Sequence, residues 1–475
     1  MVFSSAIFLF VFLPLVLTGY YLVPRSLRNA YLLAASLGFY AWGEGFLVLL
    51  MLTSVALNYA GGRIIDACRA QRSRKIALGI TLAANLLLLG WFKYANFIAD
   101  NMNVVLEAVG LPTWGLDPVH LPIGISFFTF QAMSYVVDIY RGDARVQTNP
   151  VNSALYIALF PQLIAGPIVR YHHIDEQLRE RSHSLDLFAG GVVLFVIGLG
   201  KKMLIANPMG EVSDRIFAIP ADELTASVSW IGAIAYTLQI YFDFSGYSDM
   251  AIGLGRMFGF QFLINFNYPY ISRSMREFWR RWHISLSRWF RDYLYIPLGG
   301  NRVSPRRVYV NLLVVFFLCG LWHGASWNFV IWGLIHGAFL AGERTFLGRW
   351  VWQLWRPVQH AYVLFVVIVA WVFFRAETLD HALLYLAAMF GFGDGDGLLH
   401  HAAMYVDPLT VLILVSGFIG STPVWPALRR RLADLQPRAC ALVDTAMIGA
   451  LMLLIFAASL HLAAGTHNPF IYFRF

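Results

Sequence analysis

Long apolar runs recur along the chain and are separated by short segments that hold most of the arginine and lysine residues. An α-helix needs roughly 20 mostly apolar residues to cross a bilayer. Several windows approach that length: Ala6–Val23, Asn29–Tyr40, Ile76–Phe92, Leu185–Gly200, Val308–Gly320, Phe329–Ala341, Ala361–Phe374 and Leu442–Ala464. The pattern predicts an all-α polytopic membrane protein.

The composition agrees with this class. Hydrophobic residues make up 59% of the 475 positions and charged residues only 13%, which is far more apolar surface than a soluble fold needs. The net charge is +8, but the basic residues lie between apolar segments rather than on one face. Such spacing is typical of cytoplasmic loops, so we expect membrane lipids as partners and no nucleic acid.

The same charge bias predicts a topology. Basic segments expected on the cytoplasmic side are Arg25–Arg28, Arg63–Lys75, Arg141–Arg145, Arg302–Arg307, Arg344–Arg356 and Arg429–Arg438. The acidic, glycine-containing segment Glu377–Asp407 is expected outside. The last window then carries the C-terminus outside, where an aromatic tail could bind a partner through Phe470, Tyr472, Phe473 and Phe475.

Proline and glycine interrupt two apolar stretches, Leu121–Gly124 and Phe160–Pro167. Irregular backbone is tolerated at membrane depth only where protein or water satisfies it, so broken or re-entrant helices are expected there. Without a repeat or a low-complexity linker, residues 1–475 are interpreted as one membrane-embedded domain. The three cysteines have no metal-type spacing, and His172, His173 and His183 fit no strong ligand pattern, so no metal is expected.

His323 is the strongest candidate for chemistry, because an ionisable side chain between two apolar segments is costly in a membrane. If the flanking arginines are both cytoplasmic, His323 lies deep, near the far end of a cytoplasmic funnel. Gly324 would allow close approach of a substrate, and Trp322 and Trp327 would form walls. A desolvated neutral imidazole suits proton abstraction from a hydroxyl group. The alternative is a histidine that only hydrogen-bonds a carbonyl group in a helix turn.

Residues 273–293 form the second candidate. The spacing of the aromatic residues between Phe278 and Trp289 predicts one amphipathic helix, with His283 turned inward. Arginines beside it could hold the phosphates of a nucleotide-bearing donor. The candidate donor-binding residues are Trp279, Arg280, Arg281, Trp282 and Trp322. For the arginines, a plain interfacial anchor is the competing interpretation.

Two carboxylates, Asp243 and Asp249, lie in an apolar and aromatic stretch with a glycine between them. Buried acids are normally paired or hydrogen-bonded. They could relay protons or shape a substrate site, but a structural role is favoured because the sequence identifies no partner for either.

The chain resembles the membrane-bound O-acyltransferase family over nearly its whole length, with the likeness strongest to the branch that acetylates alginate in bacteria. The segments that carry the resemblance are Leu121–Gln131, Phe160–Ile168, Tyr241–Asp249, Phe278–Ser287 and Leu321–Ala325. It implies a ring of roughly 11 or more transmembrane helices, with re-entrant segments around a central funnel. It also implies that the family's membrane histidine is His323 and that its second polar residue, asparagine in many relatives, is His283.

The resemblance further implies an O-acetyltransferase of the bacterial inner membrane with a periplasmic C-terminus. It would hold no permanently bound cofactor and would use acetyl-CoA as co-substrate. The acetyl group would pass outward to an exopolysaccharide such as alginate, with a periplasmic acetyltransferase or esterase-like protein as partner. Alternatives are D-alanyl transfer to teichoic acid, a proton-coupled transporter or flippase for a lipid-linked saccharide, and a subunit that only anchors a soluble transferase.

Overall fold

The computed structural model describes residues 2–433, 437–465 and 471, and within these ranges it contains helices and no strand. The all-α class is therefore confirmed. The chain forms two compact units, Met1–Val192 with Ala251–Leu263, and Val193–Met250 with Ile264–Phe475. Two of the three boundaries fall within helices, α9 (Leu185–Gly200) and α11 (Ala226–Met257), and the third follows Leu263 in an irregular segment. The single domain over residues 1–475 stays a prediction.

The first unit is built mainly from the four long helices α2, α3, α4 and α5. Helix α3 packs against both α4 and α5, and α2 packs against the shorter α6. Its helices are α1 (Leu13–Leu22), α2 (Arg28–Glu44), α3 (Val48–Ala67), α4 (Gln71–Ala108), α5 (Ile125–Arg141), α6 (Pro150–Ala158), α7 (Phe160–Leu163) and α8 (Asp175–Arg179). Shorter turns are η1 (Phe8–Phe12), η2 (Arg25–Leu27), η3 (Gly45–Leu47) and η4 (Tyr171–His173).

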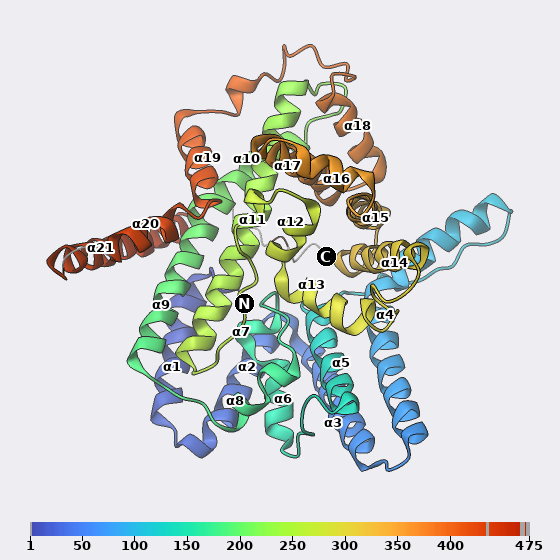
Figure 1. The fold of residues 1–475 in the computed structure, drawn as a ribbon, viewed down its shortest axis with the longest axis vertical. Helices are drawn as coiled ribbons and strands as arrows, with labels where there is room; N and C mark the ends of the chain where they lie inside the picture. The colour runs from blue at the N-terminus through green and yellow to red at the C-terminus, as the bar shows by residue number, and fades with distance from the viewer. Residues whose placement is uncertain (1, 434–436, 466–470, 472–475) are drawn as a thin grey trace. The chain divides into compact units, whose positions relative to one another are not determined.

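In the second unit the closest pair is the hairpin of α14 and α15, beside which α17 lies (Figure 1). Its helices are α10 (Asn207–Phe217), α12 (Met275–Arg281), α13 (Ile284–Phe290), α14 (Pro305–His323), α15 (Trp327–Gly342), α16 (Phe346–Gln353), α17 (Arg356–Arg375), α18 (Leu379–Met389), α19 (Pro408–Gly420), α20 (Val424–Ala433) and α21 (Pro437–Ala463). Shorter turns are η5 (Lys201–Ala206), η6 (Pro269–Ile271), η7 (Arg291–Tyr295) and η8 (Ala402–Met404).

Helix starts follow local chemistry. Proline stands in the first turn of α14, α17 and α19, where its missing N–H costs nothing. The side chains of Asn149, Thr378 and Asp407 accept hydrogen bonds from first-turn amides of α6, α18 and α19. Capping residues and prolines therefore set several of the boundaries that apolar patterning alone leaves open.

Within the described residues, six helical stretches are long and apolar enough to cross a membrane, or seven if the bent pair α19 and α20 forms one span. They are Arg25–Ala67, Gln71–Ala108, Leu185–Phe217, Pro305–His323, Arg356–Arg375 and Ala441–Ala463. Shorter apolar helices, among them Trp327–Gly342, add to these. A multi-pass membrane protein is thus supported, whereas the expected count of about 11 helices is not confirmed.

The two proline- and glycine-interrupted stretches are both irregular and pack against each other. Gly124 has a φ of 75° and ends the irregular segment before α5. A side chain there would meet the backbone carbonyl oxygen of Leu163, 2.6 Å away, because residues 163–164 pack directly against this turn. The break expected at Phe160–Pro167 is present, since α6 ends at Ala158 and only the short α7 follows, whereas Leu121–Gly124 ends the irregular segment between α4 and α5 and interrupts no helix.

A glycine contact joins the end of α9 to the middle of α11. A Cβ atom on Gly246 would lie 2.7 Å from the Gly198 carbonyl oxygen. The close approach brings two successive lysines opposite two aspartates: Lys202 Nζ lies 2.7 Å from Asp243 and Lys201 Nζ lies 2.6 Å from Asp249. Helix α11 runs unbroken through Gly246, so this glycine serves helix packing and does not interrupt the helix.

Replacing Gly246 with alanine should force α9 and α11 apart. We expect the free energy of unfolding to fall by about 1–3 kcal/mol, as for other overpacked contacts, measured as a lower melting temperature in detergent. Gly79→Ala in α4 is the matched control, because no heavy atom lies within 4 Å of a Cβ built there. Equal melting temperatures for the two variants would contradict the packing role.

Candidate functional site

His323 is the last residue of α14 and is only 3% exposed. The centroid of its ring lies 4.9 Å from that of Trp322, 4.9 Å from that of Trp332 and 5.2 Å from that of Phe374. An aromatic box therefore surrounds the imidazole. Trp322 takes the place expected of it, whereas Trp327 is 52% exposed and Trp332 stands as the second wall.

The turn after His323 is tightly packed. A side chain on Gly324 would meet the ring of Phe329, and one on Gly320 would meet the carbonyl oxygen of Phe329. The small residues here thus let α14 and α15 close onto each other. The space beside Gly324 is therefore filled by the Phe329 ring and is not an opening for substrate.

His283 is completely buried and adopts the left-handed conformation, with φ 40° and ψ 56°. It separates α12 from α13, so the single amphipathic helix expected over residues 273–293 is wrong. A non-glycine residue in this region is uncommon and costs free energy unless its surroundings hold it. Apolar spacing could not reveal the break, because the residues that cause it are remote in the sequence.

The buried side chain of Asn265 stabilises the turn at His283 by hydrogen bonds. Its Oδ1 atom accepts hydrogen bonds from His283 Nδ1 at 3.2 Å, from Ser285 N at 3.1 Å and from Ser285 Oγ at 2.9 Å. Its backbone carbonyl accepts from Ile284 N, and its Nδ2 donates to Ser248 Oγ on α11. Because Oδ1 can only accept, His283 carries its proton on Nδ1 and its lone pair on Nε2.

The two histidines lie close together, with ring centroids 6.4 Å apart. The Phe244 ring also packs against His283 in a T-shaped arrangement, at a centroid distance of 4.6 Å. Burial lowers the pKa of His283 to about 3. This imidazole is therefore neutral at physiological pH, and it stands beside His323 in an aromatic setting.

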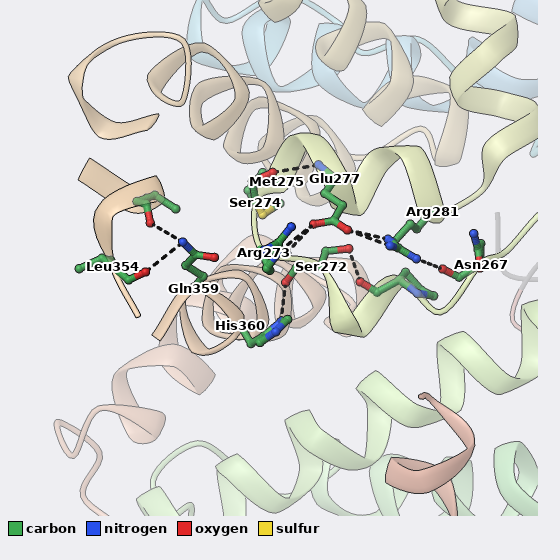
Figure 2. Close-up of polar contacts among 12 residues, drawn as sticks. Asn267, Ser272, Arg273, Ser274, Met275, Glu277, Arg281, Leu354, Gln359 and His360 are labelled. Atoms are coloured by element: carbon green, nitrogen blue, oxygen red, sulfur yellow. Dashed lines mark hydrogen bonds and ion pairs between the residues drawn. The ribbon is translucent and has the colours of Figure 1, made fainter. Parts of the chain in front are cut away.

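A polar network holds α12 in place (Figure 2). Ser274 Oγ accepts a hydrogen bond from Glu277 N, and the Glu277 carboxylate accepts hydrogen bonds from the Arg273 backbone N–H and the Arg281 guanidinium. Arg281 also donates to the carbonyl oxygen of Asn267. Burial raises the pKa of Glu277, but the hydrogen bonds from Arg273 and Arg281 outweigh it and leave the pKa lowered.

Glu343, just after α15, joins that helix to the start of α12. Its carboxylate accepts hydrogen bonds from Met275 N at 2.6 Å and Arg276 N at 3.0 Å, and also from the Tyr362 hydroxyl. A carboxylate at a helix N-terminus is favoured by the amides and by the helix dipole. Burial nevertheless raises the pKa of Glu343.

A cavity of about 530 Å³ opens beside α12 and α13. Five of its lining residues are arginines: Arg276, Arg280, Arg288, Arg291 and Arg344. Its apolar wall includes Trp279, Phe316 and Cys319, and Cys319 lies one helical turn before His323 on α14. A basic cavity with an apolar wall can hold a molecule that has phosphate groups and an uncharged chain.

The predicted donor-binding residues divide into two groups. Trp279 and Arg280 line the cavity. Arg281 is bonded to Glu277 and Asn267, and Trp282 is buried among aromatic rings 5.0 Å from Phe266 and 5.0 Å from Trp371. Neither they nor Trp322, which packs on His323, are among the lining residues. Only the first two stand where a cavity ligand would touch them.

Asp243 and Asp249 have the structural partners that the sequence left unidentified. Asp243 is 1% exposed and is held by Lys202 and by the backbone N–H of Ile471 at 3.0 Å. Asp249 pairs with Lys201. The tail residues expected to bind a partner, Phe470, Tyr472, Phe473 and Phe475, lie outside the described residues.

Sequence reasoning missed four contributors to this region: Asn265, Trp332, Phe374 and His336. His336 Nδ1 accepts a hydrogen bond from Trp279 Nε1 at 3.3 Å and so fixes a wall of the cavity. His336 and Trp332 lie four residues apart on α15, which a helical projection of that apolar segment would have revealed. Asn265 stands in an irregular segment and gave no such signal.

Known proteins resemble this chain over much or all of its length. The model of the membrane-bound O-acyltransferase family matches residues 125–377. A probable alginate O-acetylase of Azotobacter vinelandii is 44% identical over 501 residues, which cover 100% of both chains. A peptidoglycan O-acetyltransferase of Helicobacter pylori is 35% identical over 476 residues, covering 88% of this chain and 89% of its own.

Removing the Asn265 side chain should release His283. In Asn265→Ala, three buried hydrogen bonds to the segment 283–285 are lost, so we expect a destabilisation of about 1–3 kcal/mol, measured as a lower melting temperature in detergent. Ser248→Ala is the matched control, because it removes only the partner of Nδ2 and leaves the contacts of Oδ1 intact. Equal melting temperatures for the two variants would show that the Asn265 side chain does not stabilise this turn.

Proposed function

Because this chain belongs to the membrane-bound O-acyltransferase family, we propose that His323 and His283 form the centre at which it transfers an acyl group. The chain is an O-acyltransferase embedded in a membrane by several helices. The observation that carries the assignment is the 6.4 Å separation of the two buried imidazoles. An ionisable pair in an apolar membrane setting is costly to keep without a function.

The donor we propose is acetyl-CoA. Its nucleotide phosphates suit the five arginines of the cavity, since guanidinium groups bind phosphate oxygens in a bidentate way. The pantetheine chain suits the apolar wall formed by Trp279, Phe316 and Cys319. That wall leads along α14 toward His323, which is four residues beyond Cys319. The thioester would then react beside the two histidines.

In the proposed reaction, His323 accepts the proton of the acceptor hydroxyl as its oxygen attacks the thioester carbonyl carbon. The new carbon–oxygen bond forms, the carbon–sulfur bond breaks, and the leaving thiolate takes the proton from His323 to become coenzyme A, which restores the neutral imidazole. His283 is a positioning group, because its Nδ1–H is committed to Asn265 and its neutral ring packs near His323. The aromatic box excludes water that would hydrolyse the thioester.

The relatives support a proposal for the acceptor, and the basic loops support one for the direction of transfer. Since alginate O-acetylases match this chain from end to end, we propose an exopolysaccharide such as alginate as the final acceptor. Basic loops are typical of the cytoplasmic side, so in this proposal the donor cavity opens to the cytoplasm from a bacterial inner membrane. The acetyl group would leave on the periplasmic side, directly or through a periplasmic acetyltransferase that meets the C-terminal tail.

His323→Ala should abolish transfer. In membrane vesicles that contain the protein and its acceptor polymer, radiolabelled acetyl-CoA should give at least about 100-fold less labelled polymer, the usual loss when a general base is removed. His401→Ala, an exposed histidine in a loop, is the matched control. Unchanged transfer by folded His323→Ala would overturn the assignment, and transport of a saccharide without acetylation would favour a flippase.

Removing a cavity arginine should weaken binding of the donor and leave the rate of acyl transfer nearly unchanged. For Arg288→Gln we expect a roughly tenfold higher KM for acetyl-CoA and a much smaller change in kcat, because a charge-assisted hydrogen bond contributes to binding in both ground and transition states. Arg72→Gln, an exposed arginine of α4, is the control. An unchanged KM would place the donor elsewhere.

A further inference from the structure

A second basic cavity lies in the first compact unit, apart from the residues assigned to acyl transfer. Its volume is about 780 Å³, and it is lined by the start of α2, the start of α6 and the segment that joins α8 to α9. The lining contains four arginines and one acidic residue: Arg25, Arg28, Arg179, Arg181 and Glu180. The acyl-transfer reaction uses none of them.

The arginines are held in place but are not neutralised. Arg181 donates hydrogen bonds to Asn29 Oδ1 at 2.7 Å and to the Tyr20 hydroxyl at 3.2 Å, and Arg28 lies over the Tyr20 ring at 5.0 Å. Within the described part of the chain, none of the four arginines in the lining lies within 4.0 Å of a carboxylate oxygen. A cavity with this excess of positive charge attracts an anion.

A histidine in the lining, His183, is also affected by the positive charge of the arginines. Tyr20 also bonds His183, which lines the cavity, at 2.9 Å. The pKa of His183 is lowered by burial and by the charges of Arg28 and Arg181. Burial is the larger cause, and the two arginine charges act in the same direction, which is consistent with the excess of guanidinium groups in the lining.

The cavity stands where two candidate spans begin. The stretch Arg25–Ala67 starts with a lining residue, and the stretch Leu185–Phe217 starts two residues after His183. Apolar side chains at these starts are turned outward: Leu22 is 80% exposed, Leu27 54% and Leu185 87%. Cationic groups at the membrane boundary beside exposed leucines suit a ligand with an anionic head and acyl chains.

From this arrangement we propose that the cavity binds the phosphate-bearing headgroup of an anionic phospholipid, whose acyl chains lie against Leu22, Leu27 and Leu185. The shared chemistry of a phosphate is also present in free nucleotides. A soluble phosphate ligand, however, gives no reason for the exposed leucines. The headgroup oxygens accept hydrogen bonds from the guanidinium groups, and Asn152 adds an amide to the lining.

The test measures binding of a fluorescent short-chain phosphatidylglycerol to the full-length protein in detergent, by fluorescence anisotropy. Unlabelled phosphatidylglycerol should displace the probe, whereas phosphatidylcholine, inorganic phosphate and coenzyme A should not at equal concentration. The double variant Arg25→Gln with Arg179→Gln should bind at least roughly tenfold more weakly. Both residues are exposed, so their removal should leave the fold intact.

The double variant Arg306→Gln with Arg307→Gln is the matched control, because it removes two exposed arginines from another basic segment. It should bind the probe as the wild type does. Equal weakening in both double variants would overturn the proposal in favour of diffuse charge attraction. Displacement of the probe by coenzyme A or phosphate at concentrations no higher than those of phosphatidylglycerol would assign the cavity to a soluble phosphate ligand. Acetyl transfer by the Arg25 and Arg179 variant, measured alongside, separates this outcome from any failure of the histidine assignment.

Discussion

The hydrogen bonds of Asn265 are the constraint on which the centre of the second unit depends. One carboxamide oxygen accepts from the His283 ring and from two groups of Ser285, and the backbone of the same residue pairs with Ile284. The chain is thereby turned at His283, which ends α12 and begins α13. Without that turn, the arginines of the two short helices would not line the same cavity, and His283 would not lie beside His323.

Burial of charge in this protein is matched by partners from neighbouring helices. Lys202 and Asp243 are almost fully buried, and a glycine contact between α9 and α11 brings them together. Glu343 likewise meets two backbone amides at the start of α12. Because unpaired charge is expensive in an apolar interior, these contacts also fix how the helices align. The Lys202–Asp243 ion pair can form only because the glycine contact lets the backbones of α9 and α11 approach closely.

The sequence predicted the helical class, most membrane windows, the burial of both histidines and the wall formed by Trp322. These predictions succeeded because apolar periodicity and the cost of a charge in a membrane are local properties. The break at His283, the lysine partners of the aspartates and the role of Asn265 could not be predicted in this way. Each depends on residues that are 18 or more positions apart, as Asn265 and His283 are. Trp332, and not the predicted Trp327, packs on His323, because nearness in sequence does not determine contact across a helix turn.

The left-handed backbone at position 283 also limits which side chains can replace the histidine. Residues that tolerate a positive φ are chiefly glycine, asparagine, aspartate and histidine, and a β-branched residue is strained there. Of these, asparagine also offers a side-chain N–H to the Asn265 oxygen. The backbone therefore restricts this position to a few small or polar residues before any demand of catalysis applies. Variation at this position among homologues should thus be expected to follow the turn as well as the chemistry.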